Sequence, residues 1–208
     1  MSYNVDLTLE VRASSKKLLI GGGGAIGGKF GTDISLQRIR DQIFIPGSTI
    51  KGVLRTSLIR ISHLLGERCC GTVLPGKLMG RDGLDINLLG GPDKFSKIFV
   101  SPVFLNGGAP VSVLAHNKID VRTGIVEEGA FFLAEYLPIG LRFQVRVYGN
   151  NLSLREARAF MVSIAELNYE RVGRAGMVEV KILREKSKIP RDLMADPVIK
   201  EVLEALSI

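Results

Sequence analysis

The spacing of hydrophobic residues changes repeatedly along the chain, and these changes constrain the fold more than any other feature. In residues 5–11, apolar and polar side chains alternate, as in a strand with one buried face. The same alternation returns in residues 141–147 and 177–183. Residues 48–65 and 153–168 instead repeat apolar side chains at steps of three and four, which predicts two amphipathic helices.

Together with the strand-like residues 98–105, these segments predict an α+β fold in a single domain of 208 residues. The order strand, helix, strand, strand, helix, strand is that of the ferredoxin-like βαββαβ core, the scaffold of RNA-recognition folds. We expect loop insertions at about 66–97 and 106–129, and a C-terminal helix at about 197–207. The core elements are expected at about 4–12, 48–65, 98–105, 130–148, 153–168 and 177–184.

Local signals refine this arrangement. Ser48 is a suitable N-cap for the first helix, and Ser153 with Glu156 has the spacing of a capping box. The proline within residues 98–105 indicates an edge strand or a bulge. Residues 21–28 hold too many glycines for regular structure, and we expect them to lead into a polar, basic loop.

The charge of the chain favours an anionic partner. Lys and Arg number 28 against 21 Asp and Glu, which gives a net charge of +7. Nucleic acid is the commonest partner of such a chain. No apolar run approaches the ~18 residues of a membrane span, so no membrane partner is expected. The adjacent Cys69 and Cys70 are poorly placed for a disulfide, and with no signal peptide at the N-terminus they predict a cytoplasmic protein.

Two segments resemble anion-binding motifs. Gly23 and Gly28-Lys29 match most of a phosphate-binding loop, but Phe30 stands where that loop needs a hydroxyl for magnesium, which disfavours an ATPase or GTPase. In residues 45–55, IPGSTIKGVLR, the amides of a helix start lie near Lys51 and Arg55. From the residues alone, a capped helix with solvated cations stays the simpler interpretation of this segment.

The segment IPGSTIKGVLR also resembles the signature of the CRISPR-associated RAMP superfamily. Three further segments agree in order: GGKFGTD at 27–33, the stretch 116–143 that begins HNKIDVRTG, and VGRAG at 172–176. The resemblance covers about residues 1–185. It is strongest to the backbone subunits of type III effector complexes.

This resemblance implies a guide-RNA-binding subunit that associates head-to-tail with its own copies and with other effector subunits. A thumb-like insertion would kink the duplex of guide and target RNA, and Asp33 would cut the target with a divalent metal ion, which we expect to be magnesium. Asp33 is therefore the candidate catalytic residue and metal ligand. The candidate RNA-binding residues are Lys29, Arg38, Arg40, Ser48, Lys51, Arg55, Arg171 and Arg174.

Several alternatives stay open. Asp33 could be a solvated loop residue or pair with Arg38 or Arg40, and the chain would then be a silent scaffold subunit. Asp41 and Asp120 are alternative carboxylates, although we expect Asp120 to be structural or to be a contact of the insertion. A free-standing guide-processing nuclease would need histidine chemistry, but the chain has only His63, which we expect to pack beside the first helix, and His116. Stacked aromatic pairs are not expected on the strands, so grip on the RNA backbone is favoured over base stacking.

Overall fold

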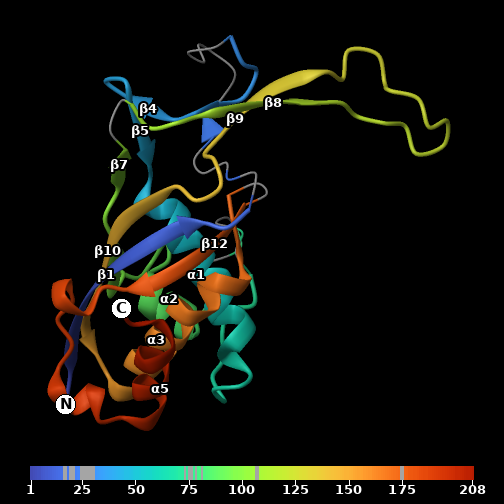
Figure 1. The fold of residues 1–208 in the computed structure, drawn as a ribbon. Coiled ribbons are helices and arrows are strands. Elements are labelled where there is room, and N and C mark those ends of the chain that lie inside the picture. Colours follow the sequence, from blue (N-terminus) through green and yellow to red (C-terminus); the bar gives the residue numbers. More distant parts are fainter. Residues whose placement is uncertain are drawn as a thin grey trace.

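The computed structural model describes residues 1–15, 18, 22–23, 31–72, 74, 77, 79–80, 82–105, 108–173 and 176–208. Its centre is a five-stranded antiparallel sheet with the strand order β11-β12-β1-β10-β6 (Figure 1). The mixture of helices with an antiparallel sheet confirms the α+β class predicted from the sequence. Among the described residues, no helix has the length and apolar character needed to cross a membrane.

Strand β1 (Tyr3–Ala13) is the central strand of this sheet, and its alternating pattern is the reason. Val5, Leu7, Leu9 and Val11 are buried on one face, while the residues between them stay partly exposed on the other. The strand pairs with β10 (Arg142–Leu152) on one side and with β12 (Gly176–Ile182) on the other.

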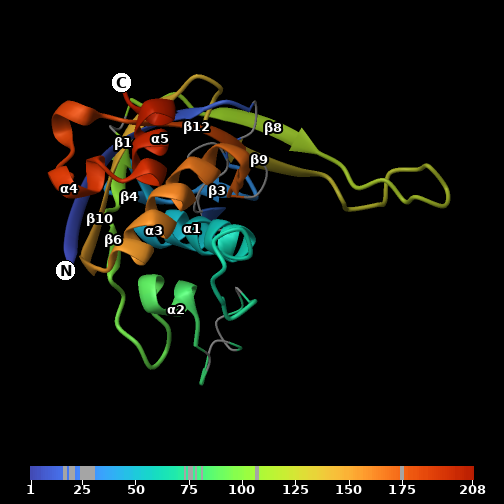
Figure 2. The same ribbon diagram turned by 90° about the horizontal axis from the view of Figure 1, so that it is seen from below.

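Three helices cover the buried face of the sheet: α1 (Gly47–Ser62), α3 (Leu154–Glu166) and α5 (Pro197–Leu206) (Figure 2). Among the described residues, no α-helix covers the opposite face, and we call it the open face. The capping box of Ser153 and Glu156 is present, and Asp196 caps α5 by accepting hydrogen bonds from the backbone of Val198 and Ile199. The expected C-terminal helix is therefore confirmed.

Smaller sheets extend the core. The strands are β2 (Gly22–Gly23) with β3 (Ser35–Leu36), β4 (Arg38–Ile39) with β5 (Gln42–Ile45) and β7 (Val103–Leu105), and β8 (Ser112–His116) with β9 (Phe132–Tyr136). The β8–β9 hairpin extends away from the body, and its connecting loop forms the far end of this arm (Figure 1). The remaining elements are α2 (Leu84–Leu89), β6 (Ile98–Val100), η2 (Leu167–Tyr169), β11 (Arg171–Val172), η3 (Arg184–Lys186) and α4 (Arg191–Met194).

Some sequence expectations need correction. Residues 98–105 are two strands, not one: β6 lies at the edge of the main sheet, β7 joins another sheet, and Ser101-Pro102 separates them because proline lacks a ladder donor. The expected loops at 66–97 and 106–129 contain α2 and β8. Within residues 21–41, the described part contains the short strands β2, β3 and β4. Elements of two to six residues hold too few side chains for a hydrophobic pattern to be recognised in the sequence.

Helix α1 also differs in detail. It ends at Ser62, and His63 follows it with an exposed side chain, so the expected packing of His63 is wrong. The residue lies just beyond the last buried turn, where Ile61 and Ser62 are the final inward-facing positions.

Candidate nucleic-acid interface

The start of α1 lies against the edge strand β6. Gly47 is the first helical residue, and a Cβ at this position would lie 2.2 Å from the carbonyl oxygen of Val100. Pro46 holds the N-cap position in an extended conformation and offers no side-chain acceptor. The sequence indicated Ser48 as the N-cap, and this prediction is wrong, because Ser48 is the second residue of the helix. The fixed φ of proline lets the helix begin directly after it.

Lys51 projects from the first turns of α1 toward β6. Its Nζ donates a hydrogen bond to Ser96 Oγ at 2.7 Å and lies 5.9 Å from the centroid of the Phe99 ring. Burial lowers the pKa of Lys51, and the positive charge of Arg55 lowers it further. An ammonium group has three donors, so Lys51 keeps hydrogen-bonding capacity for an anion.

Arg55, by contrast, is directed into the protein. Its Nη1 donates to Asp85 Oδ2 at 3.2 Å, and its Nη2 donates to the carbonyl oxygens of Gly90 at 2.7 Å and Leu89 at 3.3 Å. The side chain of Asp85 is fully buried and also accepts from the backbone of Cys70 at 2.8 Å. Arg55 thus links α1 to α2, and a phosphate would have to compete with a buried carboxylate for its guanidinium.

Asp33 lies against the start of strand β9 in the β8–β9 arm. Asp33 is exposed, and its Oδ2 accepts a hydrogen bond from the backbone N–H of Leu133 at 2.8 Å. The next residue, Ile34, forms a parallel bridge with Ala134 of β9. The loop that carries Asp33 is therefore fixed to the arm, and the second carboxylate oxygen has no hydrogen-bond partner among the described residues.

Neither basic neighbour forms the ion pair with Asp33 that the sequence left open. Arg38 Nη1 instead donates to Glu135 Oε2 at 2.7 Å, and the side chain of Glu135 is fully buried. Arg40 is exposed in the turn between β4 and β5, where Arg40 and Asp41 both have positive φ, 49° and 64°. Positive φ at both central residues is typical of the tight turns that join antiparallel strands. Asp33 thus makes no ion pair within the described residues.

The remaining candidates are dispersed or lie outside the description. Arg171 is exposed in β11, the edge strand on the side of the sheet away from β6. Lys29 and Arg174 lie outside the described residues. The alternative carboxylate Asp120 belongs to the loop at the far end of the arm, where its Oδ1 accepts from the backbone of Arg122 at 2.7 Å.

A sequence model of the RAMP superfamily matches residues 14–177. The chain belongs to the RAMP superfamily. This membership implies a CRISPR-associated role in RNA binding. A search of the curated proteins finds no match to the chain.

The described residues of this RAMP protein contain few side chains that could hold a metal ion together with Asp33. Among the described residues, no group of three or more His, Cys, Asp or Glu side chains is placed to hold a metal ion. Asp33 offers a carboxylate but no neighbouring acidic partner, and stable magnesium sites combine carboxylates with several other oxygen ligands. The described residues therefore do not form a metal site from protein ligands alone.

One feature of the RAMP protein was missed by the sequence analysis. Phe99 of β6 and Tyr148 of β10 are register partners, and their rings stack with centroids 5.0 Å apart and planes inclined by 15°. The expectation that the strands carry no stacked aromatic pair is therefore wrong. The alternation of exposed and buried residues in 142–146 continues to Tyr148, so the sequence could have predicted that Tyr148 is exposed. Its pairing with Phe99 depends on the register between β10 and β6, which the sequence alone does not reveal.

The contact of α1 with β6 predicts opposite effects for two alanine substitutions. Gly47→Ala should lower the free energy of unfolding by about 1–3 kcal/mol, because the added Cβ meets the backbone of Val100. Gly52→Ala, in the same helix, meets no atom within 4 Å and should raise it by about 0.5–1 kcal/mol. Urea unfolding followed by circular dichroism measures both. Equal effects of the two substitutions would contradict the close approach at Gly47.

Proposed function

We propose that this RAMP protein is a guide-RNA-binding backbone subunit of a type III CRISPR interference complex, and that it cuts bound target RNA at Asp33. Family membership supports the RNA-binding role. The observation that carries the finer proposal is the position of Asp33, which is exposed and is fixed by a backbone N–H at the start of β9 in the projecting arm. A catalytic carboxylate needs this combination of access and fixed position.

We also propose that the core is ferredoxin-like. The strand order β12-β1-β10-β6 supports this assignment, with α1 between β1 and β6 in the chain and α3 between β10 and β12. Every neighbouring pair among these four strands is antiparallel, as that topology requires. Strand β11 and the smaller sheets would then be additions to the core.

The start of α1 is proposed as the grip on the guide backbone. The first turn holds no acidic side chain, and no side chain caps its free N–H groups. These amides and the Lys51 ammonium suit a phosphate, because a helix N-terminus favours negative charge. Such contacts do not distinguish bases, which fits a subunit that must accept any guide sequence.

The β8–β9 arm is proposed as the thumb-like insertion, and its outer loop as a contact between copies arranged head-to-tail along the RNA. The loop exposes apolar side chains that a lone subunit leaves in water: Val121 is 97% exposed and Ile125 is 68% exposed. A head-to-tail contact joins two different surfaces and can therefore repeat along a strand. Other effector subunits would meet the ends of such an array.

The proposed chemistry is transesterification within the target RNA. The 2′-hydroxyl oxygen attacks the adjacent phosphorus, the bond to the 5′-oxygen of the next nucleotide breaks, and a 2′,3′-cyclic phosphate remains. The free carboxylate oxygen of Asp33 would accept the proton of the 2′-hydroxyl. Magnesium remains part of the proposal on the strength of the resemblance alone, since the described residues offer no ligand set for it.

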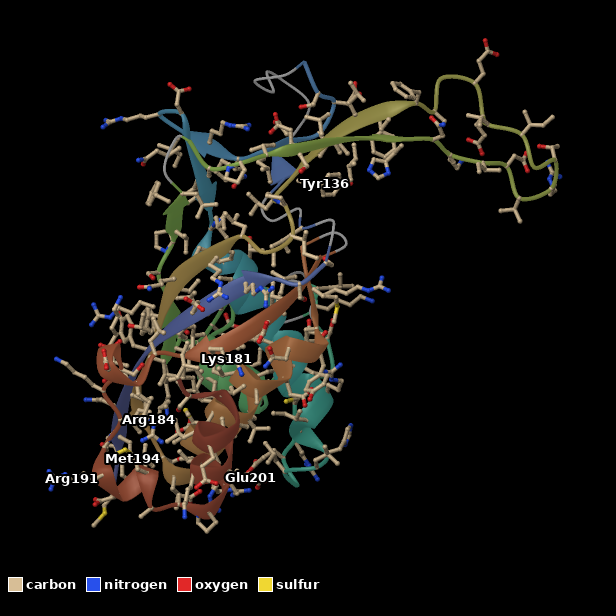
Figure 3. All side chains as sticks on the ribbon, in the orientation of Figure 1. Tyr136, Lys181, Arg184, Arg191, Met194 and Glu201 are labelled. Carbon is tan, nitrogen blue, oxygen red and sulfur yellow. The ribbon has the colours of Figure 1, made fainter. Side chains whose placement is uncertain are left out.

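The guide-processing alternative finds no support in the two histidines. His116 Nε2 lies 2.9 Å from the hydroxyl of Tyr136, and its ring stacks on Phe132 with centroids 5.0 Å apart. Tyr136 lies at the root of the arm (Figure 3). His63 follows the end of α1, and among the described residues it has no contact with His116, whose ring partners are Phe132 and Tyr136.

Replacing Lys51 tests the grip. Lys51→Ala should weaken binding about equally for unrelated guide sequences and reduce the slope of log affinity against log salt by about one, because one phosphate contact is lost. Lys200→Ala is the matched control, since Lys200 is exposed on α5 and pairs with Glu204. Fluorescence anisotropy over a salt series measures both. A loss that depends on guide sequence, or an equal loss for the control, would count against phosphate recognition by Lys51.

Replacing Asp33 tests the chemistry. Asp33→Asn should abolish target cleavage in the assembled complex and leave binding within a few fold. The amide oxygen can still accept from Leu133, so the loop stays in place while the negative charge is lost. Asp41→Asn is the control, because Asp41 is exposed in the β4–β5 turn and asparagine tolerates its positive φ. Gel analysis of labelled target RNA, with and without magnesium, gives the rates.

Three results would overturn the cleavage proposal. Full activity of Asp33→Asn would make Asp33 a structural loop residue. Absence of cleavage by both the unaltered protein and Asp33→Asn would favour the silent-scaffold alternative. Normal cleavage of a target with a 2′-deoxy nucleotide at the cut position would exclude attack by the 2′-hydroxyl.

A further inference from the structure

Four residues form a row across the open face of the sheet. Phe99 pairs with Tyr148, Tyr148 pairs with Asp6, and Asp6 forms an antiparallel bridge with Lys188. Paired residues of antiparallel segments direct their side chains to the same face, and neighbouring segments lie about 4.8 Å apart. We call these four residues the aromatic row. It holds two rings at one end and an ammonium group at the other.

The Tyr148 ring provides a partly exposed aromatic surface for a nucleobase. Tyr148 is 42% exposed and Phe99 is 41% exposed, although they stack on each other. A hollow of about 660 Å³ is lined by Tyr148, and Asn4, Asn150 and Lys188 are also among its lining residues. The asparagines offer hydrogen-bond donors and acceptors beside the ring of Tyr148.

The charge at the other end of the row suits a phosphate. The single carboxylate, Asp6, is bound by Nε and Nη2 of Arg146, and the hydrogen bond from Arg146 is the main reason that its pKa is lowered. Lys188 makes no direct ion pair with any described residue, although its charge also lowers the pKa of Asp6. Two more cations without carboxylate partners in the described part lie in the same segment. Lys186 donates a hydrogen bond to Gln144, and Arg184, which is labelled in Figure 3, donates one to Ser207.

We propose that the aromatic row binds one nucleotide of single-stranded RNA, with the base stacked on Tyr148 and a phosphate at Lys188. Single-stranded RNA is the occupant because its bases present free ring faces, whereas duplex bases are enclosed. The cations at the other end of the row disfavour an apolar protein segment. The proposal rests on the RNA-binding function but adds a site to it, since Asp6 and Lys188 both lie outside the residues matched to the family.

Affinity for a short, fluorescein-labelled oligoadenylate tests the row. Tyr148→Leu should weaken binding about 5-fold to 100-fold, which is the range for one lost base stack. Tyr148→Phe should stay within about twofold, because the ring remains. Tyr169→Leu is the matched control, since Tyr169 is 71% exposed in η2. Tyr148→Leu should leave the salt slope unchanged, whereas Lys188→Ala should reduce it by about one.

A second measurement needs no variant. Ultraviolet crosslinking of the unaltered protein to an oligonucleotide of 4-thiouridine should place crosslinks on Phe99 or Tyr148 when the peptides are mapped by mass spectrometry. Affinity of Tyr148→Leu equal to that of the unaltered protein, together with crosslinks only elsewhere, would overturn the proposal. The mass of the protein assemblies can also be compared in the absence of RNA. A lower mass for Tyr148→Leu than for the unaltered protein would overturn the proposal, because the open face would then be a protein interface.

The two proposals fail separately. If Tyr148→Leu binds normally while Asp33→Asn loses cleavage, the aromatic row is wrong and the proposed function stands. If Tyr148→Leu weakens binding while Asp33→Asn cuts RNA at the full rate, the row stands and the cleavage proposal is wrong.

Discussion

Antiparallel pairing of β1 with β10 and β12 is the constraint on which the rest of the structure depends. The register of β1 with β10 aligns the alternation of the two strands, so that Leu7 faces the helices together with its partner Val147, and Asp6 shares the open face with Tyr148. A shift by one residue would move every apolar side chain of β1 to the open face. The same register places Phe99 beside Tyr148 through β10, and β6 in turn receives the start of α1 at Gly47.

Ion pairs decide which basic residues remain available for RNA. The sequence indicated Arg38 and Arg55 as RNA ligands, but they contact the buried carboxylates of Glu135 and Asp85. Removing one partner of such a pair leaves a buried charge without compensation, so these arginines are not readily available for RNA. On the open face, every carboxylate of β1 and β12 faces an arginine of a neighbouring strand. Among the described residues, the cations without a carboxylate partner include Lys51 of α1 and, in the segment after β12, Arg184, Lys186 and Lys188.

The sequence predicts long, periodic elements well, and it fails where a contact depends on register. The alternation in β1, the capping box of Ser153 and Glu156, and the C-terminal helix each depend on neighbouring residues, and all are confirmed. The split of residues 98–105, the inward direction of Arg55 and the Phe99–Tyr148 pair depend on partners 30 or more residues away, which no local pattern encodes. Asp33 could be selected from the sequence only through the family resemblance, whereas its hydrogen bond to Leu133 needed the structure.

The central claim is that copies of this subunit line up along a guide RNA, and the mass of the protein–RNA particles tests it most directly. Mass photometry of the purified protein with single-stranded RNAs of increasing length would count the copies on each RNA. The account predicts that the count rises in steps as the RNA lengthens, because the head-to-tail contact repeats. One copy on every RNA, whatever its length, would contradict the backbone role.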